Sequence, residues 1–227
     1  MPYTGGYRDA LETKVAVSAG RQQVPKESST TVGRNSYAIL ILATLPAGPD
    51  LGRSQDNRCR HCHNEVETLG HVLGSCPHGK TLQNARHHQV RSIIATALKD
   101  ADYNNFEEVH GLSITCSTQH IDIIAFKKST RSGYIIDPTV HFETDEEQPA
   151  KVDNEKNNIY NPTIPYYLKK YQLKELEVIG LMVGARGTAT LFMKDVFQRL
   201  GIPKSIIPIV TLAALKGSIA LLKNHLY

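Results

Sequence analysis

The sequence predicts an α/β protein in which helices pack on a small mixed sheet, preceded by a small cysteine-rich unit. Apolar, β-branched runs alternate with segments of helical period from about residue 112 onward, which is typical of a sheet covered by helices. Three of the four cysteines lie between residues 59 and 76, ahead of that region. With 227 residues, 41% of them hydrophobic, the chain can bury one core of ordinary size beside a smaller appendage.

The charge and the apolar pattern limit the classes of protein to which the chain can belong. Its formal net charge is +4 and its pI is near 8.8, a modest basic excess that suits a polyanionic partner. The first residues lack the charged-then-apolar pattern of a signal peptide. The most apolar window, Ser205–Leu222, is interrupted by Pro208, Lys216 and Gly217. We therefore predict a buried final helix, running through Leu222, and no membrane span.

The first third of the chain divides into an arm and a linker. Residues 1–36 are rich in Gly, Ser, Thr, Gln and Lys and predict an irregular N-terminal arm. Tyr37–Leu45 is a continuous apolar run closed by Pro46, and it can be a short buried helix or a strand because periodicity does not decide. We assign residues 37–80 to this linker and the cysteine-rich unit, and residues 81–227 to the α/β domain.

The cysteine-rich unit has the spacing of a zinc knuckle. Two residues separate Cys59 from Cys62, and His71 and Cys76 follow at about one helical turn from each other. Three thiolates and one imidazole complete a tetrahedron, so this zinc site is closed and structural, and the metal supplies the folding energy of the unit. The alternative is a set of free cysteines in a histidine-rich stretch. The clustering indicates a reducing, intracellular compartment, and the lone Cys116 is interpreted as a core residue.

Basic residues border the predicted knuckle and open the helix that follows it. Arg58 and Arg60 flank the first cysteine, while Arg86 and His87 lie near the start of a helix predicted over Thr81–Ala101. These side chains form either a surface for nucleic-acid phosphates or an ordinary solvated face.

Two apolar runs farther along predict a hairpin with a long turn. Ile121–Phe126 and Tyr134–Phe142 are separated by the polar sequence Lys127–Gly133. A hairpin that is symmetric about Ser129 and Thr130 places Asp122 almost opposite Asp137.

The two aspartates of this hairpin form a candidate metal site. Their Cβ atoms would lie about 5 Å apart on adjoining strands, where like charges repel unless a cation lies between them. Oxygen ligands favour Mg²⁺ or Mn²⁺ over zinc. The alternative is one solvated aspartate and one that caps a turn.

Lys156 is the candidate amine for the same site, one helical turn before Tyr160. Its ammonium could stabilise charge that develops on a phosphate, and the alternative is a surface lysine. Beyond it we predict a loop rich in Pro and Tyr over Asn161–Lys170, a strand over Leu176–Val183 and a helix over Thr188–Leu200. Upstream, Asn104 and Asn105 are interpreted as part of a loop.

Over about residues 38–227, these motifs resemble the C-terminal end of the polyprotein of R-two-type non-LTR retrotransposons. In that family a Cys-Cys-His-Cys knuckle, matched by the four predicted ligands, precedes a restriction-enzyme-like endonuclease domain. The Arg-His pair of the family matches Arg86 and His87 here. Its first acid matches Asp122, and its strand with a second acid matches Asp137–Glu143. Its lysine before a tyrosine matches Lys156. The chain departs from the pattern at His120-Ile121, where Lys or Arg followed by Pro is usual, and at Ile159, where a second lysine is usual.

The resemblance implies a magnesium-dependent DNA endonuclease with the restriction-like fold. Asp122 and Asp137 would hold the metal, Lys156 would stabilise charge on the phosphate, and Glu143 would be a supporting acid. It also implies a nuclear location, a DNA target, element RNA as a further partner, and a nick that primes reverse transcription in the full-length polyprotein. The polymerase domain is not in these residues, so the chain is expected to be a fragment, a truncated copy or a separate gene. The alternatives are a non-catalytic, zinc-dependent nucleic-acid-binding module and a decayed element copy.

Overall fold

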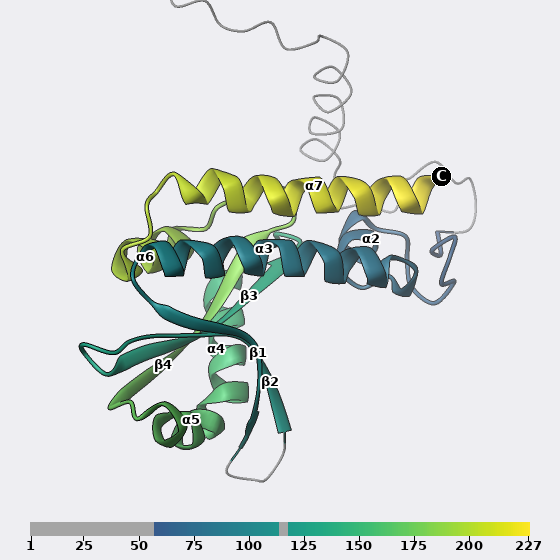
Figure 1. The fold of residues 1–227 in the computed structure, drawn as a ribbon. Coiled ribbons are helices and arrows are strands. Elements are labelled where there is room, and N and C mark those ends of the chain that lie inside the picture. Colours follow the sequence, from purple (N-terminus) through teal and green to yellow (C-terminus); the bar gives the residue numbers. More distant parts are fainter. Residues whose placement is uncertain (1–56, 114–117) are drawn as a thin grey trace, which may run out of the picture.

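The computed structural model describes residues 57–113 and 118–227 (Figure 1). The predicted arm at residues 1–36, the apolar run at 37–45 and Cys116 lie outside the described residues, so those three predictions stay predictions.

A mixed sheet with four strands forms the centre of the described structure. The strands are β1 (Asn104–Leu112), β2 (Thr118–Lys127), β3 (Ser132–His141) and β4 (Glu175–Gly184), and they neighbour one another in that order. The first three form an antiparallel meander, whereas β4 runs parallel to β3. The parallel pair requires a crossover, which two helices between β3 and β4 provide. The prediction of a small mixed sheet with flanking helices is confirmed.

Helices cover both faces of the sheet. One core joins α3, α6 and α7 to residues of the strands such as Ile123 and Ile136, and a second core joins α4 and α5 to residues such as Ile124 and Ile135 on the opposite face (Figure 1). The helical segments are α2 (Leu69–Gly74), η1 (Pro77–Gly79), α3 (Lys80–Asp100), α4 (Gln148–Tyr160), η2 (Asn161–Thr163), α5 (Ile164–Tyr171), α6 (Leu191–Leu200) and α7 (Ile206–Leu226).

The continuous apolar runs of the sequence follow from this burial. Successive side chains of a strand point to opposite faces, and both faces of β2 are covered. Ile123 and Ala125 therefore enter one core, while Ile124 and Phe126 enter the other. A strand buried on both sides needs apolar residues at every position, which is the pattern that predicted it.

The hairpin of β2 and β3 has the predicted register. Ile123 pairs with Ile136 and Lys127 pairs with Ser132, so the turn is centred between Ser129 and Thr130. The same register, extended by one position, places Asp122 opposite Asp137.

The structure contains the helix predicted over 81–101, as α3, and the strand predicted over 176–183, as β4. The next helix, α6, begins at Leu191 after the N-cap Thr190. Two predicted loops are wrong. Asn104 and Asn105 begin strand β1, and residues 161–170 form η2 and most of α5. Each of these short helices has proline in its first turn, where the missing N–H of proline costs no helical hydrogen bond.

The final helix, α7, continues beyond the predicted end to Leu226. By length and composition alone it could cross a membrane, but here it packs along α3, and 44% of its most apolar window is buried. Its C-terminal half also packs on α2: Leu69, Val72 and Leu73 share a core with residues 215–222.

Candidate functional site

The two predicted acids are both buried, and they are reached by different helices: Asp137 by α4 and Asp122 by α3. Asp122 is 7% exposed and Asp137 is 4% exposed. Two buried carboxylates on neighbouring strands need positive partners, since neither water nor the strands themselves neutralise them.

Asp137 receives its partners from α4 and from its own strand. Lys156 Nζ lies 3.3 Å from Asp137 Oδ2, and the Tyr160 hydroxyl donates to the same oxygen over 2.7 Å. The Thr139 hydroxyl donates to the other oxygen, Oδ1, over 2.9 Å. Lys156 and Tyr160 are one helical turn apart, which places both side chains on the same side of α4. The structure therefore brings Asp137 and Lys156 together as the sequence predicts.

Asp122 receives its partners from α3. His87 Nε2 lies 3.2 Å from Asp122 Oδ1, and Arg91 Nη1 lies 4.0 Å from the same atom. His87 is a predicted nucleic-acid contact; here it contacts Asp122 and keeps part of its side chain exposed. Arg91 is a site residue that the sequence reasoning missed. Its position four residues after His87, on the same face of the predicted helix, was the available signal.

The backbone beside Asp122 departs from a regular ladder. Glu107 pairs with Ile123 and Val109 with Ile121, but Glu108, which faces Asp122, has a φ of 53° and is left out of the pairing. Its carboxylate binds Arg91 Nη1 over 2.6 Å. Arg91 is thus shared between Glu108 and Asp122.

Gly180 on β4 allows α4 to come close to Asp137. It is the residue that pairs with Asp137 across the parallel strands. A Cβ at this position would lie 2.8 Å from Asp153 Cα, Lys156 Cγ and the carbonyl oxygen of Val152. The Gly180 N–H also donates to Asp153 Oδ1 over 2.8 Å. The absence of a side chain at 180 therefore determines how near the Lys156 amine can come to the acid.

Two side chains near the acids have shifted pKa values. Burial, assisted by the charge of Asp137, raises the pKa of Tyr160, which therefore stays a neutral hydrogen-bond donor at physiological pH. Burial lowers the pKa of His141, although the charge of Glu155 opposes the shift. His141 is consequently held as the neutral imidazole near the amine.

The two aspartates are oxygen donors of the kind that hard divalent cations bind in proteins. Mg²⁺ is usually held by one or two carboxylates, with the remaining positions taken by water or substrate phosphate. Asp122 and Asp137 offer that number of carboxylates on neighbouring strands. The adjacent amine of Lys156 supplies positive charge suited to a phosphate.

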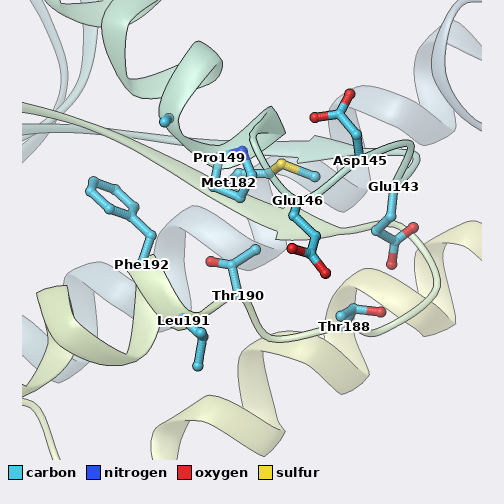
Figure 2. Close-up of a pocket in the computed structure, with 10 residues that line it drawn as sticks. Glu143, Asp145, Glu146, Pro149, Met182, Thr188, Thr190, Leu191 and Phe192 are labelled. Carbon is cyan, nitrogen blue, oxygen red and sulfur yellow. The ribbon is translucent and has the colours of Figure 1, made fainter.

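Glu143, the predicted supporting acid, has a different partner. Arg186 Nε lies 3.2 Å from Glu143 Oε2, and the Arg186 backbone N–H donates to the other oxygen over 3.3 Å. Glu143 also borders a pocket of about 520 Å³ with Asp145, Glu146 and apolar residues of β4 and α6, shown in Figure 2. Its observed contacts therefore belong to this pocket and to Arg186 and not to the two aspartates.

The four predicted zinc ligands converge. The sulfur atoms of Cys59, Cys62 and Cys76 and a ring nitrogen of His71 all lie within 4.8 Å of one another. Cys59 Sγ is 3.7 Å from Cys76 Sγ, and Cys62 Sγ is 3.3 Å from His71 Nε2. With ordinary zinc bond lengths, the edges of a tetrahedral site are about 3.8 Å between two sulfurs and about 3.6 Å between sulfur and nitrogen. This cluster can therefore hold a metal such as zinc.

The surroundings of His71 orient its ring for that role. His71 Nδ1 lies 2.8 Å from Glu65 Oε2 and 3.0 Å from Ser75 Oγ, which leaves Nε2 facing the sulfurs. A carboxylate on the distal nitrogen is the usual support of a metal-binding histidine. The side chain of Thr68 accepts from the His71 N–H and so begins α2.

The thiols of the cluster differ in acidity. A hydrogen bond from the backbone of Asn64 is the main cause that lowers the pKa of Cys62 to about 7. Burial raises the pKa of Cys76 to about 11. Metal binding requires thiolates, so a cation must displace a proton from Cys76 at neutral pH.

The knuckle is docked on the end of α7. His225 Nε2 lies 3.1 Å from Glu67 Oε2, and His61 Nε2 is 2.9 Å from the carbonyl oxygen of His225. Arg60 forms an ion pair with Glu67 at 2.6 Å. Burial would raise the pKa of Glu67, but the hydrogen bonds from Arg60 outweigh it and bring the value to about 2. The Arg60 guanidinium is thus engaged in holding the knuckle together.

Arg86 occupies a place at odds with the predicted nucleic-acid contact. It is 4% exposed, and it donates to Ser218 Oγ over 2.8 Å and to the carbonyl oxygen of Leu73 over 2.9 Å. Burial lowers its pKa to about 10. Arg86 therefore joins α3 to α7 and α2. Of the other predicted basic contacts, Arg58 is exposed, and Arg60 and His87 keep 22% and 30% of their side chains exposed.

The chain matches no known protein family, and no curated protein is significantly similar to it.

Proposed function

We propose that this chain is a metal-dependent DNA endonuclease with a restriction-enzyme-like domain, of the kind that its motifs resemble in R-two-type non-LTR retrotransposons. One observation carries the proposal. The amine of Lys156 lies 3.3 Å from Asp137, and the register of β2 and β3, continued one position beyond the Ile123–Ile136 pair, sets Asp122 across from Asp137. Two acids and an amine at one point of a sheet suit the hydrolysis of a phosphodiester.

In this proposal each side chain has a separate role. Asp122 and Asp137 hold Mg²⁺ or Mn²⁺, and a bound ion of this kind lowers the pKa of water and neutralises charge on the scissile phosphate. Lys156 stabilises the charge that develops on the phosphate oxygens. Tyr160 and Thr139 fix the orientation of the Asp137 carboxylate through the hydrogen bonds described above.

His87 and Arg91 act on the other acid. Both approach the same oxygen of Asp122 from α3, so they orient that carboxylate and leave its second oxygen for the cation. The exposed part of His87 can contact a phosphate next to the cleaved bond. The zinc knuckle is structural in this proposal, with Arg58 on its surface as a contact for DNA or for element RNA.

The test is nicking of supercoiled plasmid DNA by the full chain with and without Mg²⁺. We expect nicking that depends on the metal, and its loss in Asp137→Asn. The matched control is Asp195→Asn, which removes the same charge from an exposed position of α6 and should nick like the unmodified chain. If the folded chain with Mg²⁺ or Mn²⁺ leaves the plasmid intact, or if Asp137→Asn cleaves normally, the nuclease proposal fails.

One observation favours a second candidate, a non-catalytic nucleic-acid-binding module that depends on zinc. Both oxygens of Asp137 already have partners, in Lys156, Tyr160 and Thr139, as in an ion-pair network that only stabilises the fold. This candidate expects Asp137→Asn to lower the free energy of unfolding, and it expects DNA binding without cleavage in the unmodified chain.

A further inference from the structure

An aromatic ladder runs from the second core to the surface at the far end of the sheet from the acids. Its rings are Tyr167, Tyr171 and Phe106. The ring centroids of Tyr167 and Tyr171 are 6.1 Å apart at an interplanar angle of 7°, and those of Tyr171 and Phe106 are 5.6 Å apart at 16°. Tyr167 is fully buried, whereas Phe106 is 48% exposed. The ladder therefore begins in the core and ends on a half-exposed ring.

A pocket of about 500 Å³ opens at the exposed end of the ladder. Its lining contains the rings of Phe106, Phe126 and Tyr171, two basic residues, Lys128 and Arg131, and no carboxylate (the other lining residues are Gln172 and Leu173). Ligand pockets usually measure about 300–1,000 Å³, so this one can take a planar group of the size of a nucleobase.

Positive charge surrounds this pocket. Lys128 and Arg131 lie on the exposed turn between β2 and β3, and Lys169, Lys170 and Lys174 are exposed at the end of α5 and in the loop after it. The Lys170 ammonium lies 5.3 Å from the centroid of the Tyr171 ring. Cations beside open aromatic rings are the combination that binds single-stranded nucleic acid, in which bases stack on the rings and the cations follow the phosphates.

We propose that this pocket is a binding site for single-stranded nucleic acid, in which a base extends the aromatic ladder by stacking on Phe106. The adjacent phosphates lie against Lys128 and Arg131. The site goes beyond the proposed cleavage, because base stacking and phosphate contact need neither aspartate nor a divalent ion.

The pocket lies on the same strand, β2, as one of the two acids. Phe126 and Asp122 both lie on β2, four residues apart, or about 13 Å along the strand. That distance equals about four nucleotides at duplex spacing. An unpaired strand that leaves the acids in the direction of β2 would meet the aromatic ladder.

The experiment uses Phe106→Trp in the full chain, which introduces a single tryptophan because the natural sequence has none. Addition of a ~10-nucleotide single-stranded oligonucleotide should quench the tryptophan fluorescence, since a stacked base quenches an indole. An abasic oligonucleotide of the same length and a duplex should not quench it. Separate DNA and RNA strands identify the sugar, and quenching by either one supports the site.

Two further variants measure separately how much base stacking and phosphate contact contribute to binding. Phe106→Ala should weaken binding at least fivefold, the effect of losing one stacked base. Lys128→Gln should reduce the slope of log K against log salt by about 0.7, the value for one phosphate contact on a single strand. Leu191→Ala and Lys204→Gln are the matched controls, because both alter exposed residues away from the pocket and should leave binding unchanged.

The outcome that overturns the proposal is equal binding by Phe106→Ala and the unmodified chain together with unquenched tryptophan. Asp137→Asn separates this result from the nuclease test. It should bind and quench normally even where cleavage is lost, so either proposal can fail without the other.

Discussion

At the scale of single residues, the acids are held by partners of two kinds. Asp137 is held from α4 and from its own strand by an amine and two hydroxyls, and Asp122 is held from α3 by an imidazole and a guanidinium. Buried carboxylates are costly without such partners. The partners converge because residues one turn apart share a side of a helix, Lys156 with Tyr160 on α4 and His87 with Arg91 on α3.

The buried histidine beside this network should make stability depend on pH. Burial lowers the pKa of His141 in the folded chain, so the unfolded chain binds a proton more readily. The stabilisation is complete above the ordinary pKa of about 6.5 and is lost as the pH falls below it. The free energy of unfolding, measured with urea between pH 7.5 and pH 5, should decline more steeply for the natural chain than for His141→Gln. For one proton the decline is at most ~1.4 kcal/mol per pH unit.

The control for this experiment is His110→Gln, which replaces an exposed histidine of β1. Its unfolding free energy should follow the natural chain across the same range. Parallel curves for the natural chain and His141→Gln would show that His141 is not the responsible group.

At the scale of elements, the contact between α4 and β4 determines whether the amine reaches the acids. The helix approaches the strand at Gly180, where a side chain would meet the backbone of α4. A single residue also joins other helices: Arg86 connects α3 with α7 and α2, although the basic pattern around it predicted a surface contact.

Gly180→Ala should therefore destabilise the fold and impair the proposed cleavage. The added Cβ would lie 2.8 Å from Asp153 Cα, so α4 must move away from β4, at a cost of about 1–3 kcal/mol of unfolding free energy. Urea denaturation measures the first effect and plasmid nicking the second.

Gly74→Ala is the matched control, because a Cβ there meets nothing within 4 Å and the residue is helical. It should be as stable as the natural chain. A Gly180→Ala variant with unchanged stability would mean that α4 does not press against β4 as described.

At the scale of the whole molecule, α7 unites the knuckle and the core. Its first half shares the core with α3 and α6, its second half packs on α2, and His225 near its end binds Glu67 of the knuckle. The knuckle is therefore part of the body of the molecule.

Removal of the metal should loosen the knuckle and the end of α7 while the sheet persists. We expect about one zinc per chain. Chelation should then abolish amide-exchange protection in residues 57–79 and in the last turns of α7, because the metal supplies the folding energy of the knuckle. Protection in β2 and β3 should remain.

His71→Ala should reproduce the effect of chelation, and His63→Ala, which alters an exposed neighbour outside the cluster, should not. A purified chain that contains no zinc yet protects residues 57–79 fully would contradict the zinc assignment.

By itself, the sequence determined the features that depend on short spacings. The four residues of the cysteine–histidine cluster are recognisable because metal geometry restricts the intervals between such residues. The register of the β2–β3 hairpin follows from the position of the turn and the apolar runs on either side. The helical spacing of Lys156 and Tyr160 is likewise local.

The tertiary structure alone decided which charged residues face solvent and which hold the fold together. Arg86 and Ser218 are 132 residues apart, and Glu67 and His225 are 158 residues apart, so no local sequence pattern predicts their contacts. Arg91 and Glu143 likewise have partners on other elements, 16 and 43 residues away. The physical reason is that burial and ion pairing depend on the packing of distant elements, whereas a sequence pattern reports only neighbours along the chain.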